Sequence, residues 1–149
     1  MRFLILLAAA GSFTASTASA SNPFGNFSRS CTRVGLFHNF FLSATCFHPE
    51  DDGTNALSAN ELDLAMCIGL DQRSGRMQWE VYGKLSNYCA NCTIRAPVGR
   101  VEHLLTCSCQ PLMGSRGPAR STLNLDEGIA NDWGTLRCAG GIAASPRGD

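Results

Sequence analysis

The chain has 149 residues, and its 12 basic and 12 acidic side chains give a formal net charge of zero. A balanced charge gives no electrostatic reason to expect a nucleic acid or an anionic membrane as partner. Beyond its N-terminal segment, the sequence has no apolar stretch long enough to predict a membrane span.

Residues 1–20 have the features of a secretory signal peptide. Arg2 supplies a positive charge, the run FLILLAAA is apolar but too short to cross a bilayer, and residues 18–20 read ASA, an A-x-A cleavage signal. We therefore expect the mature chain to begin at Ser21 and to be secreted into the extracellular space. What remains is enough for one domain, or for two small repeats around a shared core.

The rest of the chain carries an even number of cysteines, which in a small secreted protein is typical of a disulfide framework. They are Cys31, Cys46, Cys67, Cys89, Cys92, Cys107, Cys109 and Cys138. Cys89 and Cys92 also have the CxxC spacing of zinc and redox sites. Zinc would need a second compatible pair, and no patterned histidine lies near the CxC of Cys107 and Cys109. A redox CxxC should begin a helix, whereas NYCANCTIRAP predicts a strand ending in a turn. We therefore favour disulfides.

The sequence is duplicated with a period of 61 residues. Between residues 26 and 68, nine positions are identical to the position 61 residues later, where average composition would give about three. Cys31 falls on Cys92 and Cys46 on Cys107, and after Ile68 the first copy carries two extra residues. The other four cysteines have no counterpart under this shift, which predicts that they were added after the duplication.

Each copy is predicted to have the same elements in the same order. Two strands flank a turn, and the second strand ends in Thr-Cys, as in FFLSATC (40–46) and VEHLLTC (101–107). A loop rich in Gly, Pro and Ser follows, HPEDDGTNALSAN or QPLMGSRGPARS, and then a helical turn and a final hairpin. Gly75 and Gly134 lie where the hairpin turns need a positive φ. The tail AGGIAASPRGD (139–149) has no periodicity, and we expect it to be disordered.

The predicted hairpins indicate a disulfide pairing. Cys31 and Cys46 lie 15 residues apart, as do Cys92 and Cys107, so each pair would face across antiparallel strands. Each bridge would stabilise the fold by about 3 kcal/mol in the chain-entropy model. The other four cysteines allow three pairings, which stay open. We favour Cys89–Cys109, further out on the same hairpin, with Cys67–Cys138.

Four motifs together resemble the cyanovirin-N homology family: GNFSRSC, LDLAMCIGL…GRMQWE, NYCANC…LLTC and LNLDEGIANDWGTL. The resemblance covers residues 25 to about 138, with repeat one at about 25–80 and repeat two at about 86–138. It implies an elongated, pseudo-symmetric, mostly β protein with a triple-stranded sheet, a hairpin and short helical turns in each repeat. The hairpin of one repeat would pack with the sheet of the other. It also implies a non-catalytic lectin for high-mannose or related glycans, without metal or cofactor, as a monomer or a domain-swapped dimer.

The resemblance further implies one carbohydrate site at each end of the molecule. The first end would offer Asn26, Arg29, Ser30, His48, Asn131 and Asp132. The second end would offer Ser86, Asn87, Asn91, Ser108 and Gln110. Amides and hydroxyls of this kind hydrogen-bond sugars. We expect the first end to be the better site, because its turn, NDWG, is compact while the matching turn in repeat one carries the insertion.

The sequence departs from the family pattern at both ends. Phe47 and Pro49 replace acidic and Thr residues, Gly69 and Leu70 replace Glu and Asn, and in repeat two Ala90 and Cys109 replace an acidic and a polar residue. NFS at Asn26 and NCT at Asn91 are also N-glycosylation sequons. A glycan on either asparagine would cover the site to which that residue belongs.

Two other functions compete with the lectin. A secreted protein with this fold and no sugar binding would act through protein partners or as a structural component of the cell surface. A small hydrolase would need a nucleophile with a base and an orienting group, and the sequence presents no such set. His38, His48 and His103 do not cluster in the sequence and predict no metal site. We expect Trp79 in the core, and Trp133 either against a ligand or packed on the surface.

Overall fold

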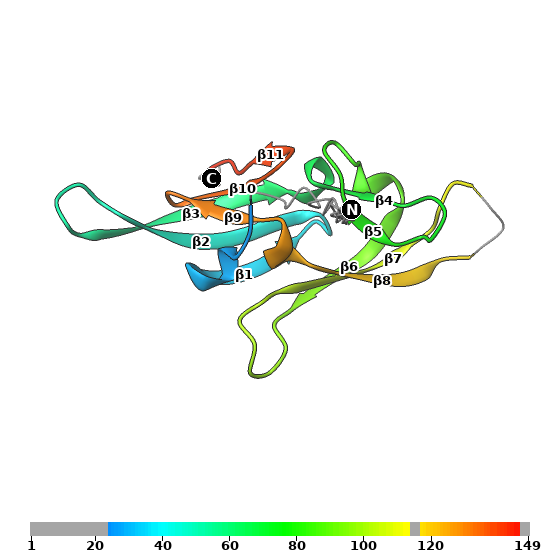
Figure 1. Ribbon diagram of the computed structural model, residues 1–149, viewed down its shortest axis with the longest axis horizontal. Helices are drawn as coiled ribbons and strands as arrows, with labels where there is room; N and C mark the ends of the chain where they lie inside the picture. The colour runs from blue at the N-terminus through cyan, green and yellow to red at the C-terminus, as the bar shows by residue number, and fades with distance from the viewer. Residues whose placement is uncertain (1–23, 114–116, 147–149) are drawn as a thin grey trace, which may run out of the picture.

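A computed structural model describes residues 24–113 and 117–146. The expected signal peptide lies outside the described residues. The molecule is elongated and built of antiparallel strands joined by short 3-10 turns (Figure 1). The strands are β1 (Cys31–Phe37), β2 (Phe41–Pro49), β3 (Asn55–Asp63), β4 (Ile68–Leu70), β5 (Met77–Trp79), β6 (Cys89–Arg95), β7 (Leu104–Cys109), β8 (Ala119–Asn124), β9 (Ala130–Asp132), β10 (Thr135–Cys138) and β11 (Gly141–Ile142). The 3-10 turns are η1 (Phe27–Arg29), η2 (Leu64–Met66), η3 (Leu85–Asn87) and η4 (Leu125–Glu127).

Each repeat contains a three-stranded sheet followed by a hairpin, as predicted. Repeat one has the sheet β1–β2–β3 and the hairpin β4–β5, and repeat two has β6–β7–β8 and β9–β10. Along the central strands every second side chain is buried, as in Leu42, Ala44 and Cys46 of β2, because successive side chains of a strand point to opposite faces. Each sheet therefore has one apolar face that another element must cover.

The covering element comes from the other repeat. In Figure 1 the hairpin β9–β10 lies against the sheet β1–β2–β3, and β4–β5 lies beside β6–β7–β8. Two buried polar side chains, 61 residues apart, fix these contacts. Asn60 of β3 donates to the Gly134 carbonyl (2.7 Å) and accepts from the Leu136 amide (2.9 Å) of the opposite hairpin. Ser121 of β8 accepts from the Met77 amide (2.9 Å). The duplication thus extends to the polar contacts between the repeats.

All four predicted disulfides are present. Cys31–Cys46, Cys89–Cys109 and Cys92–Cys107 bridge neighbouring strands with Cα–Cα distances of 4.0, 4.0 and 4.1 Å. Cys67–Cys138 spans 71 residues of sequence and joins the start of one hairpin to the end of the other. This last bridge ties the two repeats together covalently.

The strand register corrects one part of the sequence alignment. Cys31 pairs with Cys46 in the first rung of its sheet, directly after η1 and before a bulge at Arg33 (φ 51°). In repeat two the pair that directly follows η3 and precedes the bulge, at Asn91 (φ 52°), is Cys89 with Cys109. The structural counterpart of Cys31–Cys46 is therefore Cys89–Cys109, and Cys92–Cys107 is the extra bridge of repeat two. The uniform shift of 61 was wrong here because the true offset is 58 in the first strand and 63 in the second.

Two loop predictions were also wrong. Most of the expected loop at 48–60 belongs to β2 and β3, and β8 takes in the end of the loop at 110–121. These segments are polar, but β3 and β8 pair with the central strand of their sheets, through nine rungs in repeat one and six in repeat two. The tail is ordered through residue 146: β11 pairs with β10, and Ala144 bridges Glu61. Residues 147–149 lie outside the described part.

Both hairpin-turn predictions are confirmed. Gly75 and Gly134 have φ values of 70° and 84°, in the left-handed region that favours glycine. The longer turn of repeat one is closed by Asp71, which accepts from the Arg73 amide and the Ser74 hydroxyl. These hydrogen bonds hold the pKa of Asp71 below its ordinary value. Trp79 is half-buried against the core, as expected.

The two inter-repeat anchors predict a graded loss of stability. Asn60→Ala removes a buried amide and leaves the Gly134 carbonyl and the Leu136 amide without their partner, so it should lower the free energy of unfolding by about 2–4 kcal/mol. Ser121→Ala removes one hydrogen bond and should cost about 1–2 kcal/mol. Urea unfolding with the disulfides intact measures both. Equal small losses in the two variants would show that the amide does not anchor the hairpin.

Candidate functional site

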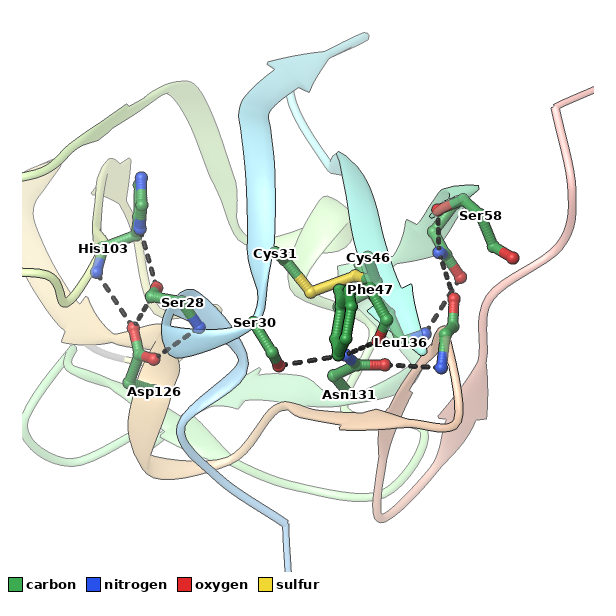
Figure 2. Close-up of a disulfide and its surroundings, with 12 residues drawn as sticks. Ser28, Ser30, Cys31, Cys46, Phe47, Ser58, His103, Asp126, Asn131 and Leu136 are labelled. Atoms are coloured by element: carbon green, nitrogen blue, oxygen red, sulfur yellow. Dashed lines mark hydrogen bonds between the residues drawn. A yellow bond between two sulfur atoms is a disulfide. The ribbon is translucent and has the colours of Figure 1, made fainter. Parts of the chain in front are cut away.

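The first end is organised around the side chain of Asn131 on β9 (Figure 2). Its amide nitrogen donates to the Ser30 hydroxyl (2.9 Å) and to the Phe47 carbonyl (2.7 Å). Its carbonyl oxygen accepts from the Gly134 amide (2.7 Å). Both amide hydrogens are therefore used within the protein, and Asn131 joins the β9–β10 turn to the start of β1 and to β2. This amide holds the end together rather than facing solvent unpaired.

The other first-end residues either contact the protein or are free for a ligand. His48 contacts the protein: its Nε2 lies 3.1 Å from the Ser58 hydroxyl, and its ring packs so closely on Gly134 that a Cβ there would overlap it. Asp132 forms an exposed ion pair with Arg137 (2.9 Å). Asn26 directly precedes η1 and Arg29 ends it; both are exposed, and their side chains form no hydrogen bond to the described residues.

Trp133 stands at the tip of the β9–β10 hairpin and is 71% exposed. Its φ of 49° places a bulky residue in the left-handed region, which side chains of this size rarely adopt. The neighbouring Gly134 also has a positive φ, as in the tight hairpin turns that match the twist of two strands. The turn thus holds an indole ring in solvent beside Asp132.

Behind the first end lies a buried cluster that sequence reasoning missed. Asp126 is 6% exposed, and its carboxylate accepts from the Ser28 amide (2.9 Å), the Ser28 hydroxyl (2.6 Å) and the His103 amide (3.0 Å) (Figure 2). Its partners are 98 and 23 residues away, so no local pattern marks the cluster.

The cluster contains Ser, His and Asp but has the wrong order for catalysis. Ser28 gives its hydroxyl proton to Asp126, so it receives the Nδ1 proton of His103 across 2.7 Å. A hydrolytic triad instead needs the carboxylate on the histidine and an unprotonated histidine nitrogen facing the serine. The cluster links the start of repeat one to repeat two and supplies no activated nucleophile.

The second end presents an open hollow of about 350 Å³. Four of the five predicted residues line it, together with Tyr88 and Pro118: these four are Asn87, Asn91, Ser108 and Gln110. Their side chains form no hydrogen bond to the described residues. Ser86, the fifth, is exposed on η3 but does not line the hollow.

Local structure explains why these side chains converge. The bulge turns Asn91 outward, and asparagine tolerates the left-handed φ that the bulge requires. The backbone amide of Gln110 donates to the backbone carbonyl of Tyr88 (2.8 Å), which brings the end of β7 against the end of η3. By the corrected register, Asn87 occupies the place that Arg29 has in repeat one.

Within the described ranges, 24–113 and 117–146, no group of His, Cys, Asp or Glu side chains could hold a metal ion. In the same ranges, no helix is long and apolar enough to cross a membrane. The two ends together offer amides, hydroxyls, a carboxylate and aromatic rings, and these groups can bind a polar ligand by hydrogen bonds and stacking.

Comparison with known proteins gives one family. The profile described as CVNH domain matches residues 27–137. The solution structure of GzCVNH, from Gibberella zeae, is 30% identical, with a TM-score of 0.62 over 77% of this chain and 98% of that one. Microvirin, in complex with mannobiose, is 25% identical, with a TM-score of 0.59 over 78% of this chain and 100% of that one.

A designed cyanovirin-N homolog lectin is 21% identical, with a TM-score of 0.62 over 76% of this chain and 98% of that one, and shows the shared fold. No curated protein matches the chain in sequence.

The hydrogen bonds of the first end predict that Asn131 and Asp132 differ in role. Asn131→Ala removes the partners of three groups and should lower the free energy of unfolding by about 2–3 kcal/mol. Asp132→Ala breaks an exposed ion pair and should cost less than about 1 kcal/mol. Thermal or urea unfolding compares the two variants. An Asn131→Ala variant as stable as the wild type would show that the amide is free to bind a ligand.

Proposed function

The chain belongs to the CVNH family, whose members are non-catalytic carbohydrate-binding lectins, and we propose that it is itself a secreted lectin for oligomannose-type or related glycans. One observation carries the proposal. Four polar side chains without internal partners converge on a single hollow at the second end. Unpaired amides and hydroxyls that line a concave surface are the groups with which proteins bind sugar hydroxyls.

Rigidity supports this assignment. Cys89 of the cross-strand bridge Cys89–Cys109 lines the hollow, and the bridge Cys92–Cys107 lies on the other side of the bulge that carries Asn91. A backbone held in this way loses little conformational entropy when a ligand binds. The half-buried ring of Tyr88 adds an apolar surface to the hollow, against which the C–H face of a sugar can lie.

We place the main site at the second end and a weaker site at the first. The sequence favoured the first end for its compact turn, but the side chains of Ser30, His48 and Asn131 already bind groups of the protein there. Asn26 and Arg29 are left for a ligand, whereas Asp132 is exposed but already paired with Arg137. Trp133 extends this surface with an exposed ring that can stack on a sugar.

Secretion agrees with the cysteine chemistry. Every cysteine is in a disulfide, and such bridges persist in oxidising compartments. Asn26 and Asn91 are both exposed, so both sequons are open to glycosylation. A glycan on Asn91 would fill the hollow of the second end, and the active lectin is then the form in which Asn91 is unmodified.

The proposal predicts a selective loss of binding. Asn87→Ala combined with Gln110→Ala removes two amides from the hollow and should weaken binding of mannobiose or a high-mannose glycan by about tenfold or more, because each amide contributes about 0.5–1.5 kcal/mol. Calorimetry on protein from the bacterial periplasm, which forms disulfides and adds no N-glycans, measures this.

Arg29→Ala, at the opposite end, is the matched control and should leave the main affinity unchanged. If Arg29→Ala abolishes binding while the double variant retains it, the main site is at the first end. If no glycan on an array binds the wild-type protein, the lectin proposal fails, and a protein partner becomes the better hypothesis.

A further inference from the structure

The hollow at the second end continues onto the outer face of the sheet β6–β7–β8. Asn91 and Ser108 also line a second hollow of about 370 Å³, which includes Thr93, Thr106 and Arg120. A third, of about 300 Å³, shares these last three residues and adds Arg95 and Thr122. The shared residues make one groove that runs from the proposed sugar site across the sheet.

A row of three threonines forms the floor of this groove. Thr93 pairs with Thr106, and Thr106 with Thr122, so the three hydroxyls lie side by side across the sheet and span about 10 Å at the usual strand spacing. The Thr106 and Thr122 hydroxyls are 2.9 Å apart and share one hydrogen bond. Each hydroxyl can donate once and accept twice, so the row retains capacity for a polar ligand.

Two arginines flank the row. Arg95 ends β6 on one side, and Arg120 lies on β8 opposite Ser108 on the other. Both are exposed, and within residues 24–113 and 117–146 neither forms an ion pair. Arg76, from the β4–β5 turn, borders a further hollow next to Arg120. The positive charge is local, because the chain as a whole has a formal net charge of zero.

The fold does not require these residues. In the corrected register, the threonine row corresponds to Gly35, Ser43 and Glu61 of repeat one, and Arg95 and Arg120 correspond to Phe37 and Ala59. The equivalent face of repeat one thus has an acidic residue in place of a threonine and no arginine at either flank. The cationic groove is a property of repeat two alone.

We propose that this groove binds the anionic part of an acidic saccharide, one that carries carboxylate or sulfate groups, while its neutral part occupies the hollow at Asn87 and Gln110. Arginine matches these oxyanions because its planar guanidinium donates two parallel hydrogen bonds. The threonine hydroxyls bind the sugar hydroxyls between the charges. The inference rests on the proposed lectin function and names a ligand class for the same end.

The test compares three tetrasaccharides on unglycosylated protein: mannotetraose, tetragalacturonate, which carries carboxylates, and a heparin-derived tetrasaccharide, which also carries sulfates. We expect at least one acidic probe to bind more tightly than mannotetraose, with an affinity that falls as salt rises. Arg120→Gln and Arg95→Gln should each weaken that probe about tenfold and leave mannotetraose unchanged. Arg33→Gln, an exposed arginine in the equivalent bulge of repeat one, is the matched control and should change neither.

Each alternative result is decisive. If the acidic probe still binds Arg120→Gln and Arg95→Gln with unchanged affinity, or if Arg33→Gln weakens it equally, the groove is not its binding site. Equal binding of a single-stranded DNA oligonucleotide of the same charge also overturns it, because the surface would then attract any polyanion. If mannotetraose binds and neither acidic probe binds more tightly, the inference fails and the lectin proposal stands. If only an acidic probe binds, the inference stands and the oligomannose assignment fails.

Discussion

The hairpin of each repeat covers the apolar face of the other repeat's sheet, and the remaining structure depends on this exchange. Leu136 on β10 and Met77 on β5 are buried at equivalent positions in the two hairpins. Next to each of them, a polar side chain of the opposite sheet, Asn60 or Ser121, binds the backbone of the hairpin. Neither repeat can close its core alone, so the two fold as one unit with an open end on each side.

The disulfides constrain the two repeats unequally. Cys67–Cys138 joins the two hairpins and restrains how they pack on the opposite sheets. Repeat one has a single bridge in its sheet, whereas repeat two has two, placed on either side of the bulge. The additional bridge, Cys92–Cys107, lies under the surface on which the hollow and the threonine row are found. The sheet that carries these unpaired polar side chains is therefore also held by two disulfides.

The sequence predicted the architecture because the duplication is visible in the cysteines and apolar residues, whose spacing is fixed by their packing in the core. It missed β3 and β8 because edge strands need only half of their side chains to be apolar, and the small and polar residues of NALSAN resemble a loop. It also misplaced the counterparts of Cys31 and Cys46, because the offset between the repeats is 58 in the first strand, 63 in the second and 61 in the third. Between equivalent rungs, the β6–β7 connection is longer than its counterpart and the β7–β8 connection is shorter, so no uniform shift aligns all three strands. Asp126 gave no signal at all, since its partners are distant in sequence and meet only when the repeats dock.

One substitution between the repeats explains why the two ends differ in chemistry. Asn131 pairs with Leu136 in its hairpin, and the equivalent residue, opposite Met77, is Leu70. Asn131 uses its amide to bind Ser30 and Phe47, so the polar groups of the first end are satisfied from within. Leu70 is buried and offers no such groups. The side-chain amide of Gln72, in the turn of the same hairpin, accepts from the Leu112 backbone and does not line the hollow. The hydrogen-bonding groups of the second end are then free for solvent or a ligand; they belong to Asn87, Asn91, Ser108 and Gln110. The end that has a leucine in place of this asparagine is, for that reason, the end best suited to bind something else.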